Sequence, residues 1–267
     1  MVEFQRKDFY SYEDFLEIMR LLRAPGGCPW DREQTHGSIR RNFLEETYEV
    51  LDAIDHDDAH GMCEELGDVL MQVAFHAQIE AERGRFTMAD VVNGVAQKLV
   101  YRHPHVFGDV QADTSQQVLN NWEVLKRREK GQRSTADAVE SVPHTLPALW
   151  RAEKVQKKAK KAGFDWPDVS GALDKLSEEL EELKTAVAQG TNVAEELGDL
   201  LFAAVKAGRF LGLDSEQALT RACDKFIRRF QTVEERAGGR PLGELPLEEL
   251  EALWAQAKAE EAPTQKP

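Results

Sequence analysis

The stretch FLEETYEVLDAIDHDDAHGMCEELGDVLMQVAFH, residues 43–76, carries acidic side chains at two helical spacings. Three glutamates fall within an arc of about 100° on one helix, because residues four apart nearly complete a turn. After a short loop, a glutamate and an aspartate three residues apart lie on a second helix, beside an apolar stripe. If the two helices pack antiparallel, five acids converge: Glu45, Glu46, Glu49, Glu65 and Asp68.

Converging carboxylates of this kind suggest a metal site. Several carboxylates at one half-buried point cannot all stay ionised unless a cation compensates their charge. Ligand atoms that are all oxygen, without His or Cys, favour Mg2+ or Mn2+. The alternative is a solvated acidic helix face, which is the commoner origin of a single Glu-Glu-x-x-Glu in a chain with 31% charged residues.

A second copy of the pattern argues against chance. The stretch LSEELEELKTAVAQGTNVAEELGDLLF, residues 176–202, repeats both the glutamate trio and the Glu-Leu-Gly-Asp sequence. Its acids are Glu178, Glu179, Glu182, Glu196 and Asp199. Each copy follows a Gly-x-x-Trp segment and precedes a Lys-x-x-x-Arg and then a Trp-x-x-x-Lys pair, so the repeat extends through each half of the chain. The sequence therefore predicts two related domains.

The order of these features resembles the MazG family of nucleoside triphosphate pyrophosphohydrolases. Two connecting segments add to the resemblance: GGCPWDREQTH, residues 26–36, before the first copy, and VPHTLPALWRAEKVQKKAKKAGFDW, residues 142–166, between the copies. The resemblance covers nearly the whole chain. It implies an all-α fold, Mg2+ dependence, a homodimer, and hydrolysis of nucleoside triphosphates to nucleoside monophosphate and pyrophosphate.

Composition limits the partners. The 267 residues carry a formal net charge of −14, which argues against a nucleic-acid-binding surface. No apolar run approaches the roughly 18 residues of a membrane span, and no secretory signal opens the chain, so we expect no membrane partner and a cytoplasmic location. Three cysteines without metal-type spacing predict packed free thiols and no disulfide framework or zinc site.

Helical periods and capping sequences run through the whole chain, and no long period-2 run of β-branched residues occurs. We therefore predict an all-α fold of two tandem helical-bundle domains. Capping boxes beginning at Ser11 and Thr87 predict two of the helix starts. The predicted division is an N-terminal domain over residues 1–130, a linker over 131–147 that is poor in large apolar residues, a C-terminal domain over 148–259, and a disordered tail over 260–267.

Each acid has an expected role. A triphosphate is strongly anionic, so a carboxylate cluster can hold it only through bridging cations. The predicted Mg2+ ligands are Glu46, Glu49, Glu65 and Asp68 in the first copy, and Glu179, Glu182, Glu196 and Asp199 in the second. The first acid of each pair, Glu45 or Glu178, is then free to orient or deprotonate a water molecule. Attack at the α-phosphorus is implied by the resemblance alone.

Basic and aromatic side chains downstream of each acidic set, together with Lys175 just before the second set, are candidates for contacts with the nucleotide. Arg can bind two phosphate oxygens at once, Lys supplies a point charge, and Trp can stack on a base or ribose. The candidates are Lys98, Arg102, Trp122 and Lys126 in the first half, and Lys175, Lys225, Arg228, Arg229, Trp254 and Lys258 in the second. The alternatives are a solvated helix face for the basic residues and core packing for the tryptophans. For Trp30 and Trp166 we expect core packing.

Three hypotheses remain open at this point. One is a nucleoside triphosphate pyrophosphohydrolase of broad base tolerance, and a narrower variant prefers deoxynucleotides, damaged nucleotides or a guanosine alarmone. The third is a helical regulatory protein that binds metal and nucleotide without turnover. Both copies keep all their acids, and only Lys175 and Arg228 favour the second as the catalytic one. Because two helices cannot enclose a triphosphate, the site needs a bundle of four or more helices. The family resemblance implies that a homodimer supplies it, so we expect sites near or across the dimer interface.

Overall fold

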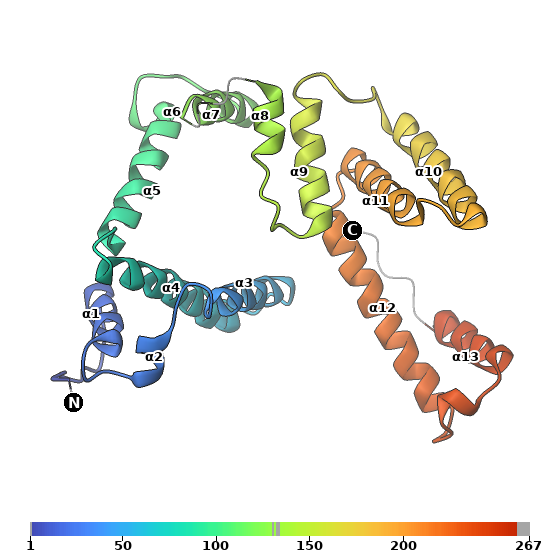
Figure 1. Ribbon diagram of the computed structural model, residues 1–267, viewed down its shortest axis with the longest axis horizontal. Helices are drawn as coiled ribbons and strands as arrows, with labels where there is room; N and C mark the ends of the chain where they lie inside the picture. The colour runs from blue at the N-terminus through green and yellow to red at the C-terminus, as the bar shows by residue number, and fades with distance from the viewer. Residues whose placement is uncertain (1, 130, 132–133, 261–267) are drawn as a thin grey trace. The chain divides into compact units, whose positions relative to one another are not determined.

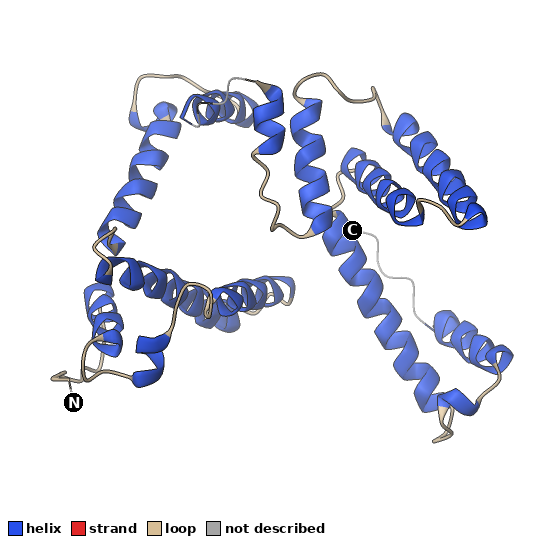
Figure 2. Cartoon of the chain, viewed as in Figure 1, coloured by secondary structure: helices blue, strands red, loops and turns tan. Residues whose placement is uncertain are grey.

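The computed structural model describes residues 2–129, 131 and 134–260, which form helices joined by loops and turns with no strand (Figure 2). The all-α prediction is confirmed. The chain divides into two compact units, residues 1–126 and 127–267, and each is described by itself. Within the described ranges, no helix is long and apolar enough to cross a bilayer.

The first unit is built on a helical hairpin. Its helices are α1 Tyr12–Arg23, α2 Pro29–Glu33, α3 Arg40–Asp55, α4 Ala59–Glu82, α5 Met88–Arg102, α6 Pro104–Phe107 and α7 Ser115–Glu129, the last of which runs past the unit boundary (Figure 1). Both expected capping boxes are confirmed: the hydroxyls of Ser11 and Thr87 accept from the N–H three residues on, and the aspartate there accepts from the cap N–H.

The hairpin of the first unit consists of α3 and α4, and α1 packs against α4. A core of Met19, Ile39, Ala74, Phe75 and Ile79 fixes this arrangement, because it joins α1 and the start of α3 to the C-terminal half of α4. The apolar side chains sit at helical spacings on α4, so one face of that helix is buried while another remains available for the acids.

The second unit repeats the hairpin. Its elements are α8 Thr135–Glu140, α9 Ala148–Lys160, α10 Val169–Gln189, α11 Val193–Phe210, α12 Ser215–Arg236, the 3-10 helix η1 Leu242–Glu244 and α13 Leu247–Glu260. Helices α10 and α11 form the hairpin, α9 packs against α11, and α12 packs mainly against α13 (Figure 1). The buried residues of the hairpin include four alanines, two on each helix, so the helices approach closely: Ala172, Ala186, Ala203 and Ala207.

The structure differs from several sequence expectations. The segment 131–147 contains α8, whose capping box begins at Ser134 and whose buried residue, Ala138, is too small to mark a core position; buried Val142 follows the helix. Trp30 is 60% exposed and Trp166 36% exposed, so the expectation of core packing is wrong for both. Cys63 and Cys223 are exposed rather than packed, although all three cysteines are free thiols. Residues 261–267 of the expected tail lie outside the described residues.

Gly190 offers a test of the α10–α11 turn. It ends α10 with a left-handed φ of 68°, a conformation that costs a residue with a Cβ about 1–2 kcal/mol. We expect Gly190→Ala to lower the free energy of unfolding by about 1 kcal/mol, measured by urea denaturation. Gly190→Asn is the matched control, because asparagine tolerates this conformation better, and equal losses from the two substitutions would contradict the explanation.

Candidate functional site

The first acidic set lies between α3 and α4. One carboxylate oxygen each of Glu46, Glu49 and Glu65 lie within 4.8 Å of one another. Phe43 contacts His76, Glu46 faces Gln72, and Glu49 interacts with Glu65, so residues later in α3 meet residues earlier in α4. The helices are therefore antiparallel, and the convergence expected from the spacing occurs.

The electrostatics of the first set show how closely its charges approach. Burial is the largest cause that raises the pKa of Glu46, followed by the negative charge of Asp68 and the hydrogen bond with Glu49. Burial followed by the charge of Glu49 raises the pKa of Glu65. Asp68 therefore belongs to this set through its field on both glutamates. The side-chain amide of Gln72 donates to Glu46 Oε1 over 3.5 Å and opposes the rise.

The second acidic set lies between α10 and α11. Carboxylate oxygens of Glu179, Glu196 and Asp199 lie within 4.8 Å of one another, and Glu179 is only 6% exposed. Glu182 completes the set, because a hydrogen bond shared with Glu179 raises its pKa. Six of the eight predicted metal ligands thus converge in two groups of three, with Asp68 beside the first group and Glu182 beside the second, and each set offers oxygen ligand atoms only.

Lysine distinguishes the second set from the first. Lys175 Nζ lies 2.7 Å from Glu179 Oε1 and 2.8 Å from Glu178 Oε1, and these hydrogen bonds raise its pKa. In the first copy the position three residues before the glutamate pair is Asn42, which carries no charge. Within the described part of the chain, no ion pair reaches the four acids of the first set. The second set therefore contains its own cation and the first does not.

The predicted water-activating acids lie at the edge of each set. Glu45 accepts a hydrogen bond from Arg41 Nε over 2.8 Å, and Glu178 accepts from Lys175. Both glutamates are exposed, and both face a cation from the preceding turn of their own helix. Glu45 and Glu178 thus lie outside the groups of converging carboxylate oxygens.

The candidate nucleotide-binding residues form separate groups. In the first unit the Arg102 guanidinium lies 5.2 Å and Lys126 Nζ 4.5 Å from the centre of the Trp122 ring. In the second unit Arg229 lies 5.9 Å from the Trp254 ring, which also contacts Phe226. The halves therefore repeat an arginine–tryptophan contact as well as the acids.

Among the described residues, the remaining lysine candidates make no hydrogen bond or ion pair with the acids. Lys98, Lys225 and Lys258 are exposed, and no hydrogen bond or ion pair among described residues links them to either acidic set. Arg228 is exposed on α12, which packs mainly against α13. Of the ten candidates, Lys175 contacts a predicted metal ligand, Glu179.

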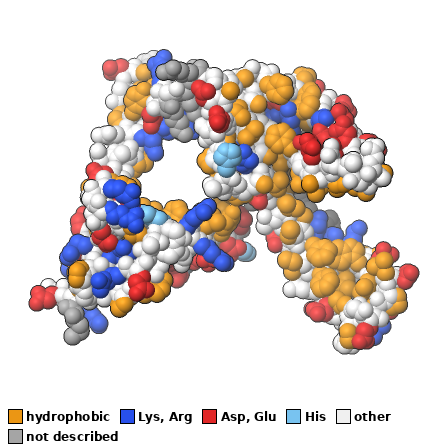
Figure 3. Space-filling model, in the orientation of Figure 1, with side chains coloured by type: hydrophobic (Ala, Val, Ile, Leu, Met, Phe, Trp, Pro, Cys, Tyr) orange, Lys and Arg blue, Asp and Glu red, His pale blue; other side chains and the backbone are white. Residues whose placement is uncertain are grey.

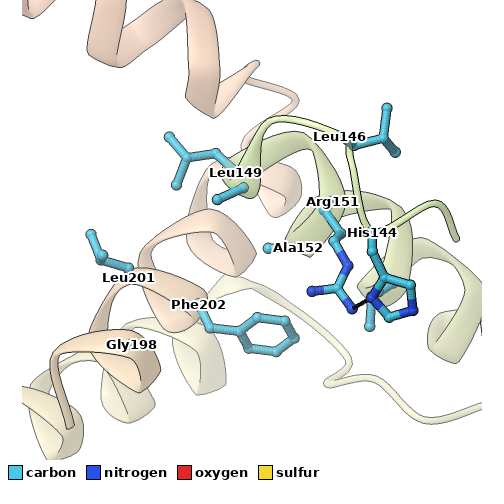
Figure 4. A pocket seen from close by; sticks show the side chains of 10 residues that line it. His144, Leu146, Leu149, Arg151, Ala152, Gly198, Leu201 and Phe202 are labelled. Carbon is cyan, nitrogen blue, oxygen red and sulfur yellow. Dashed lines mark hydrogen bonds between the residues drawn. The ribbon is translucent and has the colours of Figure 1, made fainter. Parts of the chain in front are cut away.

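An apolar cavity of about 460 Å³ opens between α9 and α11 (Figure 4). Leu201 and Phe202 line it with Arg151, whose Nη2 lies 2.9 Å from His144 Nδ1. Gly198 also lines it, two residues and hence about 200° round α11 from Glu196, so the cavity faces away from that ligand. Sequence analysis gave no sign of this cavity.

The first unit has a phenylalanine at the position that corresponds to Arg151. Phe15 precedes Trp30 by fifteen residues, as Arg151 precedes Trp166, and Phe15 packs against the core of the first unit. Arg151, which lines the cavity, thus stands where the first unit has a phenylalanine packed against its core. Gln72 is the other contact that sequence analysis missed, and its position four residues after Asp68, on the same face of α4, was the available signal.

Comparison with known proteins adds independent evidence. The model of the MazG nucleotide pyrophosphohydrolase domain matches residues 34–107 and again residues 169–234. Each match spans one acidic hairpin and the helix after it. The chain belongs to the MazG family. It is therefore an enzyme of the nucleotide pyrophosphohydrolase class, and the tandem repeat is a repeat of the MazG domain.

Several known proteins are similar to this MazG chain over most of its length. A nucleoside triphosphate pyrophosphohydrolase/pyrophosphatase MazG from Thermotoga maritima is 46% identical over 92% of this chain and 95% of its own length. A nucleoside triphosphate pyrophosphohydrolase of Escherichia coli K12 is 45% identical over 92% and 96%. Bacillus subtilis YabN, an uncharacterized protein, is 48% identical over 95% of this chain and 53% of its own length.

The raised pKa values predict the behaviour of the chain without metal. An acid with a raised folded-state pKa binds protons more readily when folded, so its ionised form destabilises the fold above that pKa. We expect Glu65→Gln to raise the melting temperature in EDTA at pH 7.5. As the pH falls toward the raised pKa of Glu65, wild type should gain stability relative to the variant, because the folded chain takes up a proton there more readily than the unfolded chain does.

Glu45→Gln is the control for this prediction. Glu45 lies next to Glu46 on the same helix but pairs with Arg41, so its replacement should not raise the melting temperature. A lower melting temperature for Glu65→Gln in EDTA would show that the converging acids do not repel one another in the folded chain.

Proposed function

We propose that this MazG protein hydrolyses nucleoside triphosphates to nucleoside monophosphate and pyrophosphate with Mg2+, and that water attacks the α-phosphorus. The observation that carries the proposal is the gathering of four carboxylates, twice, into sets with oxygen ligand atoms only. Relatives covered along nearly their whole length bear the name of this activity, which supports the assignment of substrate class. Broad base tolerance is part of the proposal, as is a role in clearing nucleotide pools.

The donor set of each site fits Mg2+, with Mn2+ as a substitute. Hard divalent cations prefer carboxylate oxygens, and the raised pKa values reflect charge that a cation would compensate. When bound, Mg2+ supplies Lewis acidity to the phosphoryl oxygens and joins the substrate to the acids. The residues that would hold it are Glu46, Glu49, Glu65 and Asp68 in one site and Glu179, Glu182, Glu196 and Asp199 in the other.

The neighbouring residues supply the other functions. Glu45 and Glu178, outside the converging oxygens, orient the water and accept its proton. Lys175 holds Glu178 and Glu179 in place before substrate arrives and offers its charge to the phosphate tail afterwards. The first site has Asn42 at this position, which supports the second site as the more active one.

A homodimer is the second part of the proposal. Leu173, Leu180 and Val187 recur every seven residues on α10 and are 47%, 42% and 62% exposed, a spacing typical of a seam between helices. Leu44 and Leu51 repeat the spacing on α3 and are 53% and 38% exposed. Hydrophobic side chains also gather over α12 and α13 (Figure 3).

A second copy of the chain would bury the exposed leucine stripe and bring basic residues to the acids. One hairpin leaves its leucine stripe in water, and a pair of hairpins would bury both stripes in a four-helix bundle. The basic residues of α12 stand apart from the acids of their own hairpin in the contacts of one protomer, so a partner is a natural source of cations for the phosphate tail. We infer that the sites lie near or across this interface.

Glutamine substitutions test the activity at each site. We expect Glu182→Gln to lower pyrophosphate release from a mixture of nucleoside triphosphates with Mg2+ by at least about 100-fold if the second site carries turnover, because a metal ligand is lost. Glu49→Gln should have a smaller effect. The measurement is production of pyrophosphate and nucleoside monophosphate together.

Glu181→Gln is the matched control, because Glu181 lies next to Glu182 but pairs with Lys184 on the outer face. It should keep wild-type activity. Equal losses from Glu49→Gln and Glu182→Gln would make both sites catalytic. Binding of Mg2+ and nucleotide by wild type without any pyrophosphate would overturn the proposed reaction and favour a regulatory binding protein.

The dimer has its own test. We expect light scattering to give twice the chain mass of 30.2 kDa, and Leu180→Glu to reduce it by placing a charge in the seam. Thr185→Glu adds the same charge at an exposed position about 140° round the helix from Leu180, so it should leave the mass unchanged. A monomeric wild type at assay concentration would rule out the shared-site arrangement.

A further inference from the structure

A pair of histidines closes one end of the first hairpin. The Nδ1 atoms of His36 and His76 lie 2.7 Å apart, and the rings stack with their centres 5.0 Å apart. His36 Nε2 lies 2.5 Å from Oε1 of Glu80, which is only 5% exposed. Arg83 and Arg85 also bind the Glu80 carboxylate. We call His36, His76 and Glu80 the histidine clamp.

The clamp holds the beginning of the first acidic helix. Helix α3 has no side-chain hydrogen bond at its N-cap, Ile39. Three contacts with the C-terminal half of α4 replace it: His36 in the clamp, Ile39 in the core, and Phe43, whose ring meets His76 edge-on at 5.9 Å. Because Glu46 is one turn after Phe43, these contacts set which residues of α4 the acids of α3 face.

Proton counting limits the charge that the clamp accepts. With both imidazoles neutral, His36 donates from Nε2 to Glu80 and accepts at Nδ1 from His76. One added proton can be accommodated on His36, if His76 changes tautomer and accepts. A second proton would place an N–H on both facing Nδ1 atoms, and at 2.7 Å they would repel. The closed clamp therefore excludes the doubly protonated pair.

The charged groups around His36 and His76 are consistent with a clamp that accepts one added proton but not two. The carboxylate of Glu80 is shared with Arg83 and Arg85, and Arg23 of α1 pairs with Glu82, two residues further along α4. From α3 the nearest contact is the uncharged ring of Phe43. Burial, followed by the charge of His36, lowers the pKa of His76. The hydrogen bond from His36, with the charge of Arg85, lowers the pKa of Glu80.

The second unit fastens its hairpin without histidine. In the Glu-Leu-Gly-Asp register, Asp68 corresponds to Asp199, so His76 corresponds to Ala207 and Glu80 to Leu211. The second unit instead has Arg209 paired with Asp165 over 2.7 Å, and Gln156 donating to the carbonyl of Phe202 over 2.8 Å. None of these groups changes charge between pH 5 and 8.

We propose that His36 and His76 are positioning residues that hold the first carboxylate set in register, and that the clamp opens when both imidazoles become protonated. Mildly acidic conditions then loosen the first site while leaving the second intact. The consequence for Mg2+ rests on the proposed function, but the opening of the clamp does not.

Hydrogen exchange of the full chain in EDTA, without nucleotide, tests the clamp. An imidazole that gains its proton only in the open form, with an ordinary pKa near 6.5, favours opening about tenfold at pH 5.5. After correction for the intrinsic exchange rate, we expect protection of residues 36–50 to fall about tenfold between pH 7.5 and pH 5.5. Protection of residues 170–186, in α10, should stay unchanged.

Two variants separate positioning from a general loss of structure. His76→Asn keeps an amide donor near the position of Nδ1 but cannot titrate, so it should abolish the pH-dependent loss in α3. His60→Asn changes an exposed histidine of the same helix and should leave the loss in place. Equal pH dependence in α3 and α10, or an unchanged loss in His76→Asn, would overturn the proposal whatever the outcome of the pyrophosphate assay.

Discussion

Repulsion among carboxylates held at one point is the constraint on which the rest of the structure depends. Four acids gather between two helices in each half, and the fold has to hold them there before any cation arrives. The two halves do so differently. In the second, Lys175 lies against Glu179, and the lysine and glutamate charges offset each other. In the first, burial and mutual repulsion raise the pKa values of Glu46 and Glu65.

Because the converging carboxylates repel one another, each hairpin needs stabilising contacts elsewhere. Alanines on both helices let α10 and α11 approach closely, and close approach brings the acids within ligand distance of one another. In the first unit, apolar contacts hold α3 against α4 at the end of the hairpin away from the α3–α4 turn. The residues that make them are Met19, Ile39, Phe75 and Ile79. The apolar contacts stabilise the geometry that the charges oppose, so each acidic set lies next to a region of tight packing.

Much of this could be predicted from sequence because it follows from helical period and repetition. The acids converge because their spacing is helical and the helices are antiparallel, and the capping boxes at Ser11 and Thr87 form as expected. The failures involve contacts between residues distant in sequence. The exposure of Trp30, the clamp between His36 and His76, and the cavity beside Arg151 depend on how elements pack, which no local pattern specifies. Helix α8 was not predicted because its buried side chain, Ala138, is small.

The two units have diverged around a constant centre. The acids, the glycine of Glu-Leu-Gly-Asp and the arginine–tryptophan contact occur in both, whereas the groups that brace the hairpins differ. Phe15 packs against the core of one unit, where the other has Arg151 beside a cavity. A histidine pair braces the first hairpin, and an arginine–aspartate pair at other positions braces the second. Chemistry that needs several oxygens at one point restricts the acids strictly, while many side-chain combinations can fix two helices in register. If the histidine clamp opens in mild acid as proposed, divergence in the bracing gives the two units different responses to pH without altering the acids themselves.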